Sequence, residues 1–145
     1  MNRKNWLLLT IAAAGGDTLS PVQLQKSMFL LGEKERKEVG KGKGFYKFVP
    51  YAYGPFCVDL YRDAEELESK GLVSIHQIMS GRWKEYRITP EGSEKAEEIR
   101  TKVNEQAFNT LVDTVDHVRA LSFNELLREV YRDYPHFSKK SVFQD

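Results

Sequence analysis

Apolar residues recur at helical intervals in the first part of the chain and predict two helices there. Trp6, Leu9 and Ala13 stack on one face of the first helix, which the sequence Gly15-Gly16-Asp17 ends. The second begins at Ser20-Pro21, because serine can cap the first turn and proline suits the first helical position. The inner face of this second helix consists of Leu24, Met28 and Leu31.

A third helix is predicted before Gly71, a residue that readily adopts the left-handed conformation found at helix ends. The sequence Tyr53-Gly54-Pro55-Phe56 is interpreted as the turn that opens this helix. Its apolar face consists of Leu60, Ala64 and Leu67.

A hairpin follows the third helix. Val73 and Ile75 alternate with polar residues, as in a half-buried strand. Ser80-Gly81-Arg82 marks the turn, and the segment from Trp83 to Ile88 forms the returning strand. Thr89-Pro90 then starts another helix. This order of helix and hairpin predicts the back half of a winged helix.

The segment between the second and third helices is polar at first and aromatic afterwards. Glycines alternate with Lys41 and Lys43, which predicts a mobile loop. The apolar sequence from Phe45 to Pro50 predicts a short strand after it.

The C-terminal third predicts a long helix from Pro90 to about Arg119, which either breaks near Asn104 to Asn109 or projects to meet another chain. Ser122 and Glu125 form a capping box for a last helix. The predicted fold class is mainly α with a small β-hairpin wing (α+β). A winged helix-turn-helix core would occupy residues 1–92, and a helical extension over 93–145 would pack on it or serve for dimerisation, within a single domain.

Composition adds few constraints to this picture. The 145 residues carry a net charge of +1, which gives no overall attraction to nucleic acid or membranes. The single cysteine, Cys57, excludes an internal disulfide and suits a reducing compartment. The apolar run from Trp6 to Ala14 is too short to span a membrane and is interpreted as the first helix rather than a signal peptide. The sequence therefore predicts a cytoplasmic protein.

Three short motifs carry a resemblance to a known family. The sequence from Leu24 to Leu31, the sequence Tyr53-Gly54-Pro55-Phe56 with Leu60-Tyr61, and Gly71-Leu72-Val73 resemble the Panacea or SocA-like antitoxin domain and its phage-associated relatives. The resemblance covers about residues 19 to 135. It implies a helical domain that neutralises toxins or acts as an adaptor through protein contacts, without catalysis.

Local charge gives candidate residues for contact with DNA. The hairpin carries Arg82, Lys84 and Arg87 around Trp83, where a guanidinium can reach the backbone or the minor groove. Tyr61 and Arg62 lie in the first turns of the third helix, and Lys41 and Lys43 could follow phosphates. That helix, however, sums to a charge of −3 over residues 55–71, which the phosphates of a DNA groove would repel. The alternatives are an ordinary solvated turn with Trp83 folded onto the sheet, and a solvated loop.

A second set of residues suits a protein partner. Tyr51, Tyr53 and Phe56 surround Gly54-Pro55 and could form a pocket or a partner surface, or instead only fix the turn. Asp63 and Glu66 on the third helix would meet a basic partner.

Catalytic and metal-binding chemistry finds little support in the sequence. Cys57 has no histidine paired with it, and His76, His117 and His136 are scattered singly rather than clustered. We therefore expect no enzyme activity, no metal and no cofactor. Two hypotheses result: a non-enzymatic winged-helix DNA-binding regulator of a toxin–antitoxin or phage-related system, dimeric through the helix after Pro90, or an antitoxin or adaptor-type module that binds a protein without DNA.

Overall fold

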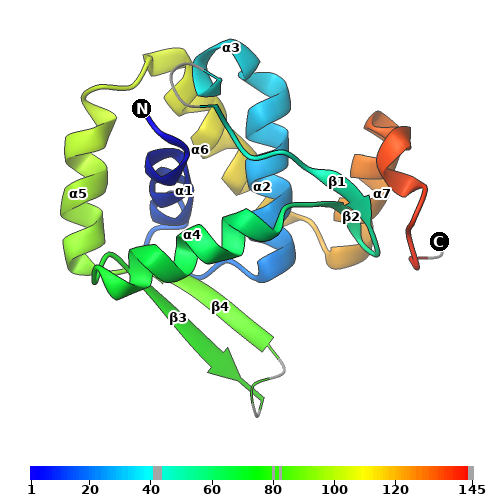
Figure 1. Cartoon of the computed structure of the whole chain (residues 1–145), viewed down its shortest axis with the longest axis horizontal. Coiled ribbons are helices and arrows are strands. Elements are labelled where there is room, and N and C mark those ends of the chain that lie inside the picture. The colour runs from blue at the N-terminus through cyan, green and yellow to red at the C-terminus, as the bar shows by residue number, and fades with distance from the viewer. Residues whose placement is uncertain (41–43, 80, 82, 144–145) are drawn as a thin grey trace.

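The computed structural model describes residues 1–40, 44–79, 81 and 83–143 of the chain. These residues form a mainly helical structure with two small antiparallel β-hairpins (Figure 1). The elements are α1 (Arg3–Ala12), α2 (Pro21–Lys34), α3 (Arg36–Val39), β1 (Val49–Tyr51), β2 (Gly54–Phe56), α4 (Val58–Ser69), β3 (Val73–Ile78), β4 (Trp83–Ile88), α5 (Pro90–Arg100), α6 (Glu105–Ala120), α7 (Phe123–Asp133) and the 3₁₀ helix Pro135–Ser138.

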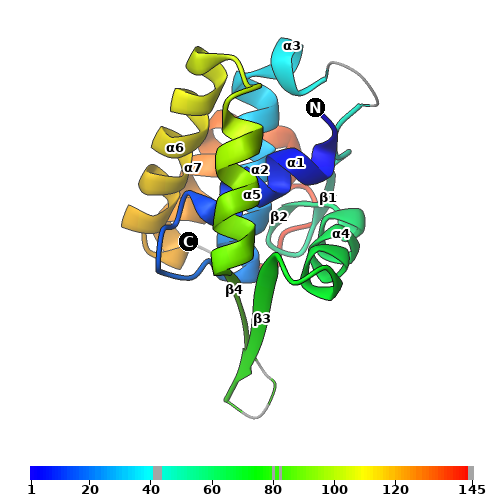
Figure 2. The same ribbon diagram turned by 90° about the vertical axis from the view of Figure 1, so that its left-hand side faces the viewer.

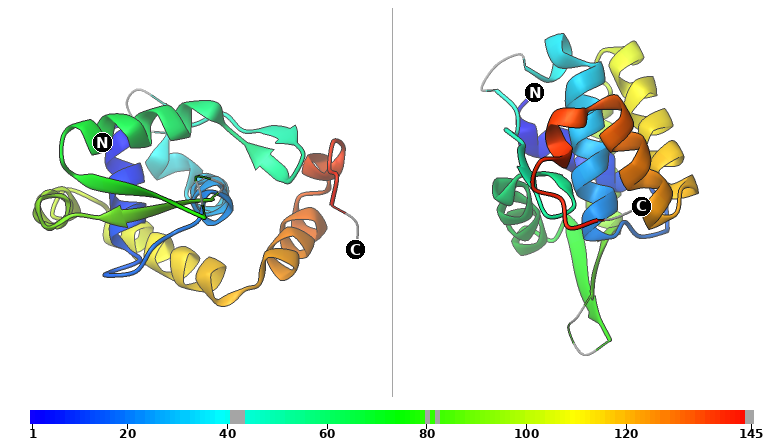
Figure 3. Two further views of the ribbon diagram at one scale, coloured as in Figure 1. Left: turned by 90° about the horizontal axis from the view of Figure 1, so that it is seen from below. Right: turned by 90° about the vertical axis from the view of Figure 1, so that its right-hand side faces the viewer.

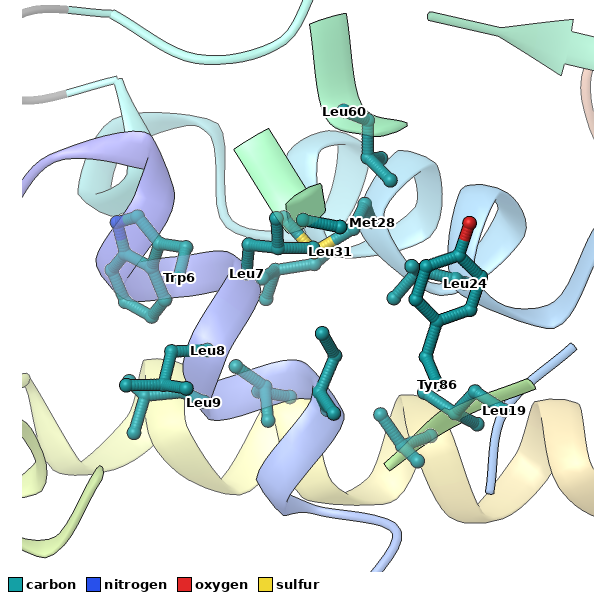
Figure 4. Packing of buried hydrophobic residues seen from close by; sticks show 14 of the residues in the cluster. Trp6, Leu7, Leu8, Leu9, Leu19, Leu24, Met28, Leu31, Leu60 and Tyr86 are labelled. Atoms are coloured by element: carbon teal, nitrogen blue, oxygen red, sulfur yellow. The ribbon is translucent and has the colours of Figure 1, made fainter. Parts of the chain in front are cut away.

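Helix α2 runs through the middle of the molecule, and the other helices are arranged around it (Figure 3). The predicted inner face of Leu24, Met28 and Leu31 is buried in the main core together with α1 (Figure 4). Another face places Phe29 and Leu30 in a second apolar cluster, which α6 and α7 complete with Val118, Leu126 and Val130. Two faces of α2 are thus buried, against different parts of the chain.

Predicted helix boundaries hold where side chains satisfy the free backbone groups of the first turn. Ser20 and Gln23 form the capping box of α2, and Ser122 and Glu125 form that of α7. Gly71 ends α4 with a φ of 76°, as its lack of a Cβ allows.

The long helix predicted from Pro90 to Arg119 is wrong as a continuous element. Residues 101–104 separate α5 from α6, and the side chain of Asn104 accepts a hydrogen bond from the amide of Ala107 at 3.0 Å. Asparagine is a strong cap because it satisfies a free amide of the first turn, so a new helix begins there. The predicted alternative of a break is therefore correct, and α6 turns back to pack along α2.

The interpretation of Gly54-Pro55 as the opening of a helix is also wrong. These residues form β2, which pairs with β1 so that Pro55 lies opposite Pro50, and α4 begins only at Val58. Gly54 has a φ of 92°, which permits the tight turn after β1. The predicted strand at 45–50 reaches only from Val49 to Tyr51.

The predicted hairpin, which is the second hairpin of the structure, is confirmed in the pairing of its strands. It projects away from the helical body (Figures 1 and 2). Strands β3 and β4 pair from Val73 with Ile88 to Ile78 with Trp83, and Tyr86 also forms an isolated bridge with Leu19. Among the helices described, none combines the length and the apolar character needed to cross a membrane.

Candidate binding pocket

A pocket of about 230 Å³ lies between the first half of α2, the β1–β2 hairpin and the start of α4. Three predicted partner residues and one predicted DNA-binding residue meet there. Its lining residues are Pro21, Val22, Gln25, Lys26, Tyr51, Tyr53, Gly54, Phe56 and Tyr61. We call it the tyrosine pocket.

Two side chains of α2 hold the backbone that frames the tyrosine pocket. The amide of Gln25 donates to the carbonyl of Cys57 at 2.9 Å and accepts from the Cys57 N–H at 3.0 Å. The ammonium group of Lys26 donates to the carbonyl of Pro55 at 3.1 Å. These bonds fix the segment between β2 and α4 against the central helix, so the pocket has a preformed frame.

Lys26 is the unusual residue of this site. Only 3% of it is exposed, and burial alone lowers its pKa from 10.5 to about 7. No nearby ionised group contributes to that shift in the part of the chain that the structure describes. Lys26 is therefore a buried amine, and no carboxylate among the described residues contributes to its pKa.

This burial predicts a pH-dependent cost that the variant Lys26→Met should remove. Between pH 7 and 10.5 the lysine is protonated in the unfolded chain and neutral in the folded chain. The free energy of unfolding therefore increases as pH rises through that range. Below pH 7 the buried charge costs the parent up to about 5 kcal/mol. The variant removes this cost, but it leaves the Pro55 carbonyl without its donor, which offsets part of the gain. We compare the free energies of unfolding of Lys26→Met and the parent in urea at pH 6 and at pH 9. The difference between them should favour the variant more at pH 6 than at pH 9. A pH-independent difference would contradict a buried charged lysine.

Aromatic side chains beside the pocket form two contacting pairs. Tyr51 and Tyr53 are 56% and 46% exposed. The ring of Tyr51 stacks on that of Phe56 at 4.9 Å between centroids, and Tyr53 meets Phe123 of α7 edge-on at 5.5 Å. We call Tyr51, Tyr53, Phe56 and Phe123 the aromatic surface. Both tyrosines therefore contact rings of their own chain and also present surface to solvent.

Tyr61, predicted to read DNA, instead forms part of the pocket wall. Its ring lies parallel to that of Tyr86 at 6.3 Å, and its hydroxyl is 3.4 Å from the carbonyl of Pro21. Burial raises the pKa of Tyr61 to about 12. The ring is thus engaged within the protein rather than presented to a groove.

The two acidic residues predicted to meet a partner are engaged by α1. Asp63 is only 5% exposed and accepts hydrogen bonds from Arg3 Nε at 2.9 Å and from the Tyr46 hydroxyl at 2.7 Å. Glu66 forms an ion pair with Lys4. Asp63 is therefore no surface residue, and the charge of −3 overstates what α4 presents, because α1 supplies cations that a sum over one helix leaves out.

The predicted DNA-binding cations do not form one cluster among the described residues. Arg62 is exposed but lies 3.6 Å from the carboxylate of Asp59. On β4, Lys84 lies opposite Gln77 and Arg87 lies opposite Ser74. Because Lys84 and Arg87 are three positions apart and successive side chains alternate, they point to opposite faces of the sheet. Arg82, Lys41 and Lys43 lie outside the described residues. Trp83 is 56% exposed.

The cysteine and two of the histidines lie apart from the tyrosine pocket or are already in contact with their own chain. Within the described residues, no three His, Cys, Asp or Glu side chains gather closely enough to hold a metal ion. Cys57 is buried, His76 contacts Ser74, and His117 pairs with Glu129.

The comparisons with known proteins add no family. Neither the scan against protein-family models nor the search of curated proteins returned a match. The resemblance to the Panacea or SocA-like antitoxin domain therefore stays a prediction from the motifs alone.

Sequence reasoning missed Gln25 and Lys26 as site residues. A signal was present for Lys26, because Val22, Phe29 and Leu30 stand four before, three after and four after it, which places it on an apolar face of α2. Gln25 carries the same signal, since Val22, Met28 and Phe29 stand three before, three after and four after it, but no local pattern contains its partner Cys57, 32 residues away along the chain.

Proposed function

We propose that this protein is a non-enzymatic protein-interaction module of the antitoxin or adaptor kind. The observation that carries the proposal is the aromatic surface of Tyr51, Tyr53, Phe56 and Phe123 beside the tyrosine pocket. Aromatic side chains dominate the energy of protein interfaces because they bury a large area at a small cost in conformational entropy.

The support for this proposal extends to the backbone beneath the aromatic surface. Gln25 and Lys26 hold the segment from Pro55 to Cys57 on the central helix. Tyr53 also rests on Phe123, a residue far along the chain. A surface that is already ordered loses little freedom on binding, so more of the contact energy appears as affinity.

A DNA-binding regulator with a winged-helix fold is the second candidate. It is supported by the order of the elements, in which α1, the bridge at Leu19, α2 and α4 precede the projecting β3–β4 hairpin. The exposed Arg87 on that hairpin supports it as well. Helix α4, however, exposes Glu65 and Glu66, and Asp59 in part, where this fold places its recognition helix. Carboxylates there oppose phosphate contact, so we place protein binding first.

The test compares variants of the aromatic surface with a matched aromatic variant elsewhere. We expect affinity purification from the native cells to retain a defined protein partner on the parent chain. Replacing Tyr51 and Tyr53 by alanine should weaken that complex at least about tenfold, about 1.4 kcal/mol. Trp83→Ala, equally exposed but on the second hairpin, is the control and should bind as the parent does.

The opposite pattern would favour the second candidate. If the parent gave a salt-sensitive mobility shift with DNA that Lys84→Ala and Arg87→Ala abolished, while the Tyr51 and Tyr53 variants changed nothing, protein binding through the aromatic surface would be refuted.

A further inference from the structure

We propose that the tyrosine pocket receives the C-terminal carboxylate of a partner chain whose last residue is apolar, with Lys26 as its counter-ion. This inference rests on the proposed function and specifies the part of the partner that is recognised.

The first argument is the missing charge partner of Lys26. Its side chain is buried and lines the pocket, and among the described residues the Pro55 carbonyl is the acceptor found for its ammonium group. An ammonium has three N–H donors, and a neutral carbonyl does not balance its charge. A carboxylate entering the pocket would supply both a further acceptor and the opposite charge, in surroundings where such an interaction is stronger than in water.

The second argument is the character and size of the pocket. Its volume of about 230 Å³ is below the usual range of about 300–1,000 Å³ for drug-sized ligands. Its walls are the rings of Tyr51, Tyr53, Phe56 and Tyr61, which suit an apolar group. A chain end with an apolar last residue offers that group and a carboxylate on the same residue. An internal Asp or Glu brings the charge without the apolar side chain.

The groups around Lys26 allow its protonation to report on binding. The tyrosines 51, 53 and 61 of β1, its turn and α4 line the same pocket. Tyr131 of α7 approaches the same face of Gly54 as the end of the Lys26 side chain, and its hydroxyl donates to Ser141 at 2.6 Å. From α1, α6 and β4, which also pack on α2, no ionised group moves the pKa of Lys26, since burial is its sole cause. The carboxylate would bind the protonated lysine, so affinity should fall about tenfold for each pH unit above 7.

Titration of the full chain with a minimal probe tests the inference. The probe is N-acetyl-phenylalanine with a free carboxylate, followed by amide chemical shifts, and the comparison compound is its amide. We expect the acid to bind at pH 6.5 at least about tenfold more tightly than the amide, and to weaken about tenfold between pH 7.5 and 8.5. Lys26→Met should lose this preference, whereas Lys4→Met, a lysine at the surface, should keep it.

Peptides identify the source of the carboxylate. An eight-residue peptide ending in phenylalanine with a free carboxylate should bind more tightly than the single residue, because preceding residues reach Tyr51 and Tyr53. The inference would be overturned if the amidated peptide, an amidated peptide with an internal glutamate, or benzoate bound as tightly as the peptide with the free C-terminal carboxylate. An affinity that did not change with pH would overturn it as well. If Lys26→Met fails to fold, the acid–amide comparison and the pH profile of the parent decide.

The two proposals fail in different ways. If the Tyr51 and Tyr53 variants lose the cellular partner but no carboxylate probe binds, the interaction function stands and the inference falls. If no partner depends on these tyrosines, the proposed function falls, and a chain end as occupant falls with it, even if small acids bind at Lys26.

Discussion

Replacing Gly92 by alanine is expected to destabilise the protein by about 3 kcal/mol or more. Gly92 lies in the first turn of α5, where a Cβ would stand 1.8 Å from the carbonyl oxygen of Leu72 and 2.8 Å from Cδ1 of Ile88. The Leu72 oxygen cannot move aside freely, because it accepts a hydrogen bond from the Thr89 amide at 3.2 Å. The start of α5 and the beginning of β3 must therefore separate to admit a methyl group.

Urea unfolding followed by circular dichroism measures this loss. The matched control is Gly16→Ala, since a Cβ at Gly16 meets no atom within 4 Å and its φ is not positive. The control should change the free energy of unfolding by less than about 0.5 kcal/mol. Equal effects of the two substitutions would show that close packing at Gly92 is not the cause.

Removing the Asp63 carboxylate should cost about 3 kcal/mol of the free energy of unfolding. Asp63→Ala leaves the Tyr46 hydroxyl without its acceptor and Arg3 without its nearest carboxylate. Burial and the hydrogen bond to Asp63 both raise the pKa of Tyr46, so this tyrosine stays a neutral donor. The loss combines an unsatisfied buried hydroxyl with a guanidinium that keeps only the more distant carboxylate of Asp59 and also lies over the Tyr46 ring.

Two further variants separate this network from surface charge. Asp59→Ala removes a half-exposed carboxylate 3.7 Å from Arg3 and should change stability by at most about 1 kcal/mol. A double-mutant cycle of Asp63→Ala with Tyr46→Phe should give a coupling energy of at least about 0.5 kcal/mol, because the two side chains share one hydrogen bond. Simple additivity of the two losses would argue against that shared bond.

Local patterns in the sequence predicted the capped starts of α2 and α7 and the strands of the β3–β4 hairpin, but not the start of α4, and they left the division between α5 and α6 as one of two alternatives. Capping boxes at Ser20 and Ser122 act within one turn, and the β3–β4 hairpin joins neighbouring segments. The β1–β2 hairpin was missed because Pro55 suits a helix start equally well, and only pairing with Pro50 decides between the two.

The candidate site was predicted in part. Tyr51, Tyr53 and Phe56 were grouped by their closeness in the sequence, and the structure brings them together at one pocket. Asp63 was placed on the surface by its charge, although its spacing from Leu60 and Leu67 puts it on the apolar face of α4. The partners that make its burial tolerable, Arg3 and Tyr46, lie 60 and 17 residues away, so no local pattern contains them.

The central position of α2 makes the fold cooperative across the chain. The side of this helix with Leu24 and Met28 belongs to the main core, while Phe29 and Leu30 belong to the cluster that α6 and α7 complete. A chain ending at residue 92 would leave that second side in water, at a cost of about 25 cal/mol for each Å² of exposed apolar surface. The predicted boundary at residue 92 thus divides two parts that both pack on one helix, and we expect them to unfold together.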